Sequence, residues 1–367
     1  MTFTNKIVVS GINFTEGGPL SVMQDFLERI SYLYADKYEI IALVHKKELY
    51  STENITYLEF EDSKSSWFKR IKYEYADFKK LSKEIKPKYW FSMHDMTPNV
   101  FCEKQFVYCH NPAPFFKPTK NDWKYGKTTA IFSLFYIYLY GINIKKNSKI
   151  IVQQNWLREE FQKKWNLDNV VVAYPSIEHK KKEISKDVKE LNKNKIQLFY
   201  PSFPRSFKNF EVICEAYEKL DKELQEKIEI KLTIDSSLNS YANFIIEKYK
   251  HLEGLKFIGL QSREKVFEIY EDSDALIFPS RLETWGLPIS EFKEFSKPIF
   301  LADLPYAHET LGDYDKVAFF NPYKAEELKN HLEKFVSKNL NFTKHNAKKI
   351  VNPHVIGWDN LLKYLIR

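Results

Sequence analysis

Two glutamates stand eight residues apart within Phe278–Phe292, the segment FPSRLETWGLPISEF. We expect Glu283 in a loop after an apolar strand, and Glu291 in the first turn of a helix that Pro288 is suited to begin. Backbone N–H groups around Gly286–Ile289 would point outward with the positive end of that helix dipole and attract an anion. A carboxylate such as Glu291 can accept hydrogen bonds from sugar hydroxyls. The alternative is that both acids only cap the helix, for about 0.3–1 kcal/mol each, but the pair inside a Gly-Leu-Pro frame favours a binding site.

Two basic residues occupy a second loop, within FYPSFPRSFKNF after the first strand of the second half. Arg205 and Lys208 could stabilise a diphosphate that gains negative charge as it leaves, through charge-assisted hydrogen bonds. The same segment by itself is equally consistent with a solvated loop in a Lys-rich chain.

The first half offers a glycine turn and a histidine. Gly17-Gly18-Pro19 joins the first expected strand to the first expected helix, and such a turn lets the backbone approach a phosphate or sugar closely. The pattern is not GxGxxG, so a plain tight turn is the alternative. His110 ends the expected strand QFVYCH and can reach a ligand, with a structural role as the alternative. Cys109 points to the opposite face of that strand, which argues against a Cys–His dyad.

Strands and helices that alternate along the chain would position these residues. Expected strands are Lys6–Gly11, Tyr38–His45, Ile55–Phe60, Tyr89–His94, Gln105–His110, Ser148–Gln154, Asn169–Pro175, Ile196–Ser202, Ile228–Asp235, Leu255–Leu260, Asp274–Ser280 and Pro298–Asp303. Expected helices are Pro19–Ala35, Trp67–Ile85 with Lys, Glu and Asp outside, Asn155–Trp165, Phe210–Leu220, one capped by Ser262, Lys324–Lys338 and Val355–Ile366. This alternation predicts an α/β fold with parallel sheets, whose ligands bind at the carboxyl ends of the strands.

The alternation breaks once, at the polar and charged segment Ser176–Lys195. A chain of 367 residues is long enough for two domains of about 100–200 residues each. We therefore expect a Rossmann-like domain over 1–176, a linker over 177–194, a second Rossmann-like domain over 195–350 and a last helix over 351–367.

Composition limits the class of protein. Three cysteines (Cys102, Cys109 and Cys214) form neither a disulfide framework nor a zinc motif, which fits a reducing cytoplasm. The N-terminus has no apolar run typical of a signal peptide. The most apolar window, Ile131–Ile144, is shorter than the about 20 residues that span a bilayer, and is either a buried helix or a surface that touches lipid. The net charge of +7 could attract an anionic membrane or nucleic acid.

At these residues the chain resembles glycosyltransferase family 4, the retaining group 1 enzymes of the GT-B fold. PSRLETWGLPISEF is similar to the family pattern PS-x-x-E-G-F-G-L-P-x-x-E, with Thr284 and Trp285 as departures. KFIGLQSREKVFEIYEDSDALIFPS, KPIFLADLPYAHETLGD and VAFFNPYKAEEL resemble the neighbouring elements, and GGPLSVMQDFL and FVYCHNP resemble parts of the first domain. The resemblance covers nearly the whole chain and is strongest between Leu255 and Leu328.

The resemblance implies a role for each candidate residue. The second domain would bind a nucleotide-sugar, with Arg205 and Lys208 on the diphosphate, Glu291 on the ribose and Glu283 on the transferred sugar. The spacing of Arg205 and Lys208 is shorter than the family usually has. Also assigned to the donor site are Ile258, Gly286, Leu287, Pro288, Gly17 and Gly18. His110 would contact the transferred hexose, and the last helix would cross back to the first domain. No cofactor and no metal are expected.

The implied activity is retaining transfer of a hexose from a GDP-mannose or UDP-hexose donor to a saccharide acceptor. A lipid-linked acceptor in cell-surface polysaccharide, lipopolysaccharide or O-antigen assembly fits a cytoplasmic enzyme with peripheral contact at the inner face of the plasma membrane. One alternative is a nucleotide-sugar epimerase on the same fold, which would need no acceptor. The other is a basic nucleic-acid-binding protein, disfavoured because the basic residues are dispersed among acids and no nucleic-acid motif is visible.

Overall fold

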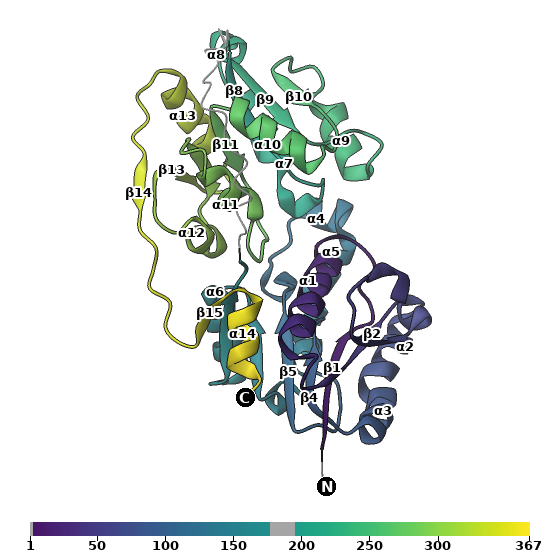
Figure 1. Ribbon diagram of the computed structural model, residues 1–367. Helices are drawn as coiled ribbons and strands as arrows, with labels where there is room; N and C mark the ends of the chain where they lie inside the picture. The colour runs from purple at the N-terminus through teal and green to yellow at the C-terminus, as the bar shows by residue number, and fades with distance from the viewer. Residues whose placement is uncertain (1–2, 177–194) are drawn as a thin grey trace. The chain divides into compact units, whose positions relative to one another are not determined.

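The computed structural model describes residues 3–176 and 195–367 (Figure 1). The chain packs as two compact units. Unit 1 comprises the described part of Met1–Pro114, Phe135–Ser176 and Ile350–Arg367, and unit 2 comprises Phe115–Leu134 and the described part of Ile177–Lys349. The division differs from the expected domains in that residues 115–134, from the first half of the sequence, group with unit 2. The expected linker 177–194 lies outside the described residues.

In the described part of unit 1, eight parallel strands form one sheet. Their spatial order is β15 (His354–Ile356), β7 (Val170–Tyr174), β6 (Lys149–Val152), β5 (Lys104–Cys109), β4 (Pro87–Ser92), β1 (Thr4–Gly11), β2 (Glu39–Val44) and β3 (Ile55–Glu59). All but β15, which the sequence had assigned to a helix, match expected strands within a few residues. The helices and short turns that accompany this sheet are α1 (Gly17–Tyr34), η1 (Lys47–Leu49), η2 (Glu61–Lys64), α2 (Trp67–Lys72), η3 (Tyr73–Asp77), α3 (Phe78–Ile85), η5 (Ile144–Lys146), α6 (Asn155–Trp165) and α14 (Gly357–Leu365).

The two faces of this sheet bury different helices, because successive strand residues point to opposite sides. Ile7 and Val9 of β1 face α1 and α14, whose Phe26 and Leu362 are buried in the same core. Val8 faces the other way, into a smaller core with α3. The last helix therefore returns to the first unit, as expected, and lies against α1 (Figure 1).

The segment Trp67–Ile85 was expected to be one helix with charged residues outside. Instead, the π-turn η3 separates α2 from α3. Glu74 lies in this turn, is fully buried and binds Nε2 of the equally buried His94, while Arg70 is also buried and donates to the carbonyl of His94 (3.2 Å). The π-helical turn η3 places Glu74 on the inner side of the segment, where it binds His94. A regular helix with all its charged residues exposed would not require this irregularity.

In the described part of unit 2, seven strands form a second sheet, parallel except for the last pair. Their order is β10 (Leu255–Phe257), β9 (Ile228–Leu232), β8 (Ile196–Tyr200), β11 (Ala275–Phe278), β12 (Ile299–Ala302), β13 (Tyr314–Phe320) and β14 (Thr343–His345). The accompanying helices are α4 (Lys120–Tyr125), η6 (Ser206–Lys208), α7 (Phe210–Glu218), α8 (Lys222–Lys227), α9 (Ser240–Tyr249), α10 (Arg263–Asp272), α11 (Leu287–Lys293), α12 (Pro305–Leu311) and α13 (Ala325–Val336). The turn η4 (Ala113–Phe115) and helix α5 (Lys127–Gly141) continue from one unit into the other.

Local capping agrees with the sequence at two helix starts. The Ser262 hydroxyl accepts a hydrogen bond from the N–H of Lys265 at the start of α10 (3.3 Å), and Pro288 lies in the first turn of α11. The expected α/β class, with two mainly parallel sheets, is confirmed. Across residues 3–176 and 195–367, every helix is too short or too polar to cross a membrane.

Candidate functional site

Lys208 and Glu283 meet at the carboxyl ends of two neighbouring parallel strands. Lys208 ends η6, after β8, and Glu283 lies in the loop after β11, which pairs directly with β8. The Lys208 Nζ forms an ion pair with Glu283 Oε1, and the two side chains are 19% and 13% exposed. The hydroxyl of Tyr200 in β8 donates to the Lys208 carbonyl (2.8 Å) and holds the turn. Two residues far apart in the sequence therefore form one polar site, partly shielded from water.

Arg205 lies just before η6 and is exposed. Its guanidinium stands over the ring of Phe203, with its central carbon 5.9 Å from the ring centroid. Lys208, not Arg205, thus reaches Glu283 in this structure.

Glu291 was expected in the first turn of α11. In the structure it lies in the second turn of that helix. Its Oε2 accepts a hydrogen bond from the Tyr270 hydroxyl (3.2 Å), and its Oε1 lies 3.4 Å from Arg263. The side chain is 14% exposed, and burial raises the pKa of Glu291 despite the nearby Arg263. The carboxylate therefore retains acceptor capacity toward a ligand.

The residues between the two glutamates form the entry to α11. Gly286 has φ of +87°, a left-handed conformation that glycine adopts readily, and precedes the half-exposed Leu287. Ile258 follows β10, and its N–H donates to the Leu232 carbonyl (2.9 Å). Like Lys208 and Glu283, Ile258 follows the carboxyl end of a parallel strand.

In unit 1, the residues expected to contact a ligand also follow the carboxyl ends of parallel strands. Gly17 begins α1 with φ of +67°, and an added Cβ at Gly17 or Gly18 would meet no atom within 4 Å, so the backbone there is open to an approaching group. His110 follows β5, and its Nδ1 lies 3.7 Å from Oδ1 of the buried Asp95. Asp95 also accepts from the His110 N–H (2.8 Å) and the Tyr140 hydroxyl (2.8 Å), so it fixes the loop that carries His110.

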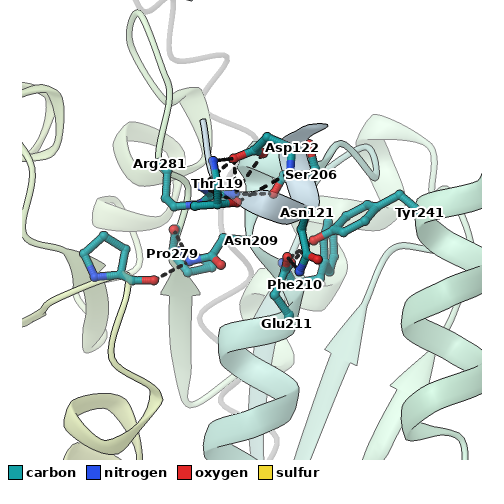
Figure 2. A network of polar contacts seen from close by, with 11 residues as sticks. Thr119, Asn121, Asp122, Ser206, Asn209, Phe210, Glu211, Tyr241, Pro279 and Arg281 are labelled. Carbon is teal, nitrogen blue, oxygen red and sulfur yellow. Dashed lines mark hydrogen bonds and ion pairs between the residues drawn. The ribbon is translucent and has the colours of Figure 1, made fainter. Parts of the chain in front are cut away.

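Sequence reasoning missed a buried ion pair next to the Lys208–Glu283 site. Arg281, two residues before Glu283, binds Asp122 of α4 (Figure 2). Arg281 stands inside the motif segment, which could have drawn attention to it. Nothing in the sequence around Asp122 indicates its partner.

Within residues 3–176 and 195–367, no cluster of three or more His, Cys, Asp or Glu side chains could hold a metal ion. That the chemistry needs no metal stays a prediction.

Comparisons with known proteins give a family match and structural neighbours. Residues 180–350 match the family described as glycosyl transferases group 1. The structure is similar to a glycosyltransferase from Rickettsia africae ESF-5, at 18% identity over 91% of this chain and 89% of that one, with a TM-score of 0.61. It is also similar to the lipopolysaccharide outer core galactosyltransferase WaaB, at 12% identity over 93% and 92%, with a TM-score of 0.62. Anabaena Alr3699/HepE in complex with UDP-glucose gives 13% identity over 91% and 90%, with a TM-score of 0.57.

Among curated proteins, no match was found. The structural neighbours share the two-sheet architecture over almost the whole of both chains, which shows the fold. The chain thus has the GT-B fold, and its residues 180–350 match the glycosyl transferases of group 1.

Proposed function

We propose that the protein is a glycosyltransferase of family 4 that moves a hexose from a nucleotide-sugar to a saccharide acceptor. The observation that carries the proposal is the ion pair of Lys208 and Glu283 at the carboxyl ends of β8 and β11, inside the part that matches the family. Parallel α/β sheets bind their ligands at this edge.

In the proposed reaction the acceptor hydroxyl attacks the anomeric carbon on the face from which the diphosphate leaves. The bond between that carbon and the phosphate oxygen breaks, and the departing diphosphate takes the hydroxyl proton. Lys208 stabilises the charge that develops on the leaving group. Glu283 is the counter-ion of Lys208, and a bound donor would share that lysine while Glu283 contacts the transferred sugar.

Glu291 would accept hydrogen bonds from the ribose. Ile258 and residues 286–288 would line the donor site. Arg205, which is exposed just before η6, would supply a second positive charge to the diphosphate. Of the residues of unit 1, Gly17 and Gly18 would let the diphosphate contact their backbone, and His110 would contact the hexose. No cofactor or metal is required in this scheme.

The donor and acceptor classes rest on the resemblance and on the neighbours. HepE is described in complex with UDP-glucose, which supports a UDP-hexose, while the family resemblance keeps GDP-mannose as the other choice. WaaB acts in the lipopolysaccharide outer core, which supports a saccharide acceptor, lipid-linked, in cell-surface polysaccharide assembly. We place the enzyme in the cytoplasm. A donor-only epimerase would turn over the nucleotide-sugar without acceptor, so incubation of donor alone discriminates the two.

The test begins with a thermal-shift screen against GDP, UDP, dTDP and CMP sugars, because a ligand that binds the native state raises the melting temperature. Replacing Lys208 with Ala should then lower kcat by about 10²–10³-fold, the usual loss for one oxyanion-stabilising donor. Lys222→Ala, an exposed change on α8, is the control and should leave kcat unchanged. Turnover of Lys208→Ala near the wild-type value would remove Lys208 from the site. The anomeric configuration of the product, read by NMR, tests retention, and an inverted product would reject it.

We also propose that α5 contacts an anionic membrane. Its exposed residues recur at helical spacing, with Ile131 at 38%, Leu134 at 49%, Phe135 at 60% and Tyr138 at 72% exposed, followed by Ile142 at 42%. The opposite side of the helix is buried. No acidic residue occurs between Asp122 and Glu159, whereas five lysines do. Apolar side chains at the interface and lysines near anionic headgroups both favour binding.

Sedimentation with vesicles tests this contact. Wild-type protein should bind vesicles of phosphatidylglycerol and phosphatidylcholine, and the double variant Phe135→Ser/Tyr138→Ser should bind at least about tenfold less, since each lost apolar contact lowers the burial free energy. Tyr323→Ser removes an equally exposed aromatic from unit 2 and serves as the control. Equal binding by all three proteins would contradict the proposed membrane contact.

A further inference from the structure

A buried, bidentate ion pair lies beside the Lys208–Glu283 site. Arg281 Nη1 donates to Asp122 Oδ2 (2.7 Å) and Nη2 donates to Oδ1 (3.0 Å), and the two side chains are 2% and 1% exposed (Figure 2). Charged side chains are rarely buried to this degree, since desolvation of each ion is costly unless the pairing is complete. Such a pair is weak grounds for stability alone, so its position needs an explanation of its own.

Arg281 ties together the two loops of the site. Its Nη2 also donates to the Ser206 carbonyl (3.0 Å), and its own N–H donates to the Phe207 carbonyl (2.8 Å). Ser206 lies two residues before Lys208, and Arg281 lies two residues before Glu283. The guanidinium and the backbone N–H of Arg281 therefore hold the loop that carries the lysine beside the loop that carries the glutamate.

Asp122 is the counter-ion of Arg281 and is itself held in place. Its Oδ2 accepts from the N–H (2.7 Å) and the hydroxyl (2.8 Å) of Thr119 in a capping box at the start of α4. A Cβ on Gly126, just after α4, would lie 2.3 Å from Ser206 Oγ, so the helix end packs closely on the lysine loop. Asn121 adds a hydrogen bond to Glu211 of α7 (3.0 Å).

The charges of this pair are held in the ionised form. Burial by itself would raise the pKa of Asp122, but the hydrogen bonds and charge of Arg281 outweigh burial and hold the pKa below its usual value. Burial would lower the pKa of Arg281, and Asp122 outweighs that effect in turn. Removal of the carboxylate charge would leave the buried Arg281 guanidinium uncompensated, and its side chain would no longer be held in this position.

We infer that Asp122 is a positioning residue of the transfer site: through Arg281 it fixes the loops that place Lys208 and Glu283. The inference rests on the proposed function and connects a residue from the first half of the sequence to the Lys208–Glu283 pair, both members of which come from the second half. Misplacement of a reacting group by about 1 Å costs about 10²-fold in rate, so a loosened loop should lower turnover without removing any group that touches substrate.

The test compares Asp122→Asn with two further variants. Asp122→Asn should lower kcat at least about tenfold with donor KM within about threefold, because the misplaced Lys208 acts on the leaving group in the transition state. Asp122→Asn breaks a buried pair and should lower the melting temperature as well. The double variant Asp122→Leu/Arg281→Met therefore removes both charges, because such replacements of buried pairs often preserve stability. The double variant should keep the wild-type melting temperature yet have the low kcat. Asn121→Ala is the control: it loosens α4 without touching either loop, and should keep kcat.

Hydrogen exchange of the free protein gives a readout that needs no substrate. The amides of Lys208 and Arg281, which bond to the Arg205 and Phe207 carbonyls, should exchange faster in Asp122→Asn and in the double variant, and not in Asn121→Ala. If the double variant regains both stability and wild-type kcat, Asp122 is only structural and the inference is overturned. If wild-type protein binds no nucleotide and transfers no sugar from any donor in the screen, the proposed function falls and the inference with it. Wild-type activity alongside an unaffected Asp122→Asn overturns the inference alone.

Discussion

At the residue scale, the site is a set of charged side chains whose partners decide what they can do. The types and spacing of Lys208, Glu283 and Glu291 pointed to a diphosphate and sugar site from the sequence alone. Their contacts could not be predicted, because neither the ion pair of Lys208 with Glu283 nor the pairing of Glu291 with Tyr270 follows from local spacing. Arg281 was missed for the same reason, since its partner stands in a different part of the chain.

If Glu291 binds the ribose as proposed, nucleotide binding should depend on pH. In the proposed site, ribose hydroxyls would donate to the ionised Glu291 carboxylate. Burial raises the pKa of Glu291, so affinity for UDP or GDP should fall as pH drops through that raised value. The loss should begin at a higher pH than for an exposed glutamate. For folding the sign is opposite: the folded state holds the proton more tightly, so the cost of burying ionised Glu291 appears as pH rises past its unfolded pKa.

Isothermal titration calorimetry from pH 7.5 downward measures this dependence, with circular dichroism to confirm that the protein stays folded. Glu291→Gln is the control, because an amide still accepts a hydrogen bond but does not titrate in this range. The phosphate of the ligand titrates equally in both proteins. The same pH dependence in wild type and Glu291→Gln would show that this carboxylate does not bind the ribose.

At the element scale, the elements predicted most accurately were those with a clear hydrophobic period. Apolar strands and amphipathic helices such as α1, α6 and α13 were found close to their observed bounds, because each buries a regular stripe against a sheet. Short elements without a clear period were not predicted, among them α4, α8, α12, β14 and β15, which have three to seven residues each. Two longer elements, β13 and α9, were not predicted either. The π-turn η3 was hidden because its cause, the buried partner His94, lies on another strand.

The turn into α11 should be sensitive to a single methyl group. Gly286→Ala places a Cβ 3.1 Å from Ile289 Cδ1 and 3.4 Å from Phe278, at φ of +87°, where a left-handed non-glycine residue costs about 1–2 kcal/mol. We expect a lower melting temperature and weaker nucleotide binding. Gly18→Ala is the matched control for stability, because its added Cβ meets nothing within 4 Å. Its melting temperature should stay at the wild-type value, and equal stability of both variants would contradict the strain assigned to Gly286.

At the scale of the whole molecule, each unit is built from more separate segments of the chain than the sequence suggested. Within the described residues 3–176 and 195–367, it passes directly from one unit to the other after residues 114, 134 and 349. The return of the last helix to unit 1 was predicted. The excursion of residues 115–134 was not, because it carries no change of composition and is held by specific contacts such as Asp122 with Arg281.

The C-terminal helix should therefore control the stability of the N-terminal sheet. Leu362→Ala removes a fully buried side chain that packs in one core with β1 and α1, which should cost about 2–5 kcal/mol. Hydrogen exchange should quicken in peptides from residues 3–114, with residues 195–349 unchanged. Lys363→Ala, on the exposed side of the same helix, should stay within about 0.5 kcal/mol of wild type. Faster exchange confined to residues 195–349 would contradict the assignment of this helix to unit 1.

The buried pair of Asp122 and Arg281 also governs how such a chain can be recombined. A hybrid that joins the first half of one enzyme to the second half of another at residue 195 inherits the acid from one parent and the base from the other. If the first parent lacks an acid at this place, the hybrid encloses a lone guanidinium, and breaking a buried pair in this way costs about 3–5 kcal/mol. With such parents, exchange of unit 2 should succeed when residues 115–134 are taken from the same parent as the second half, and fail when they are taken from the other parent.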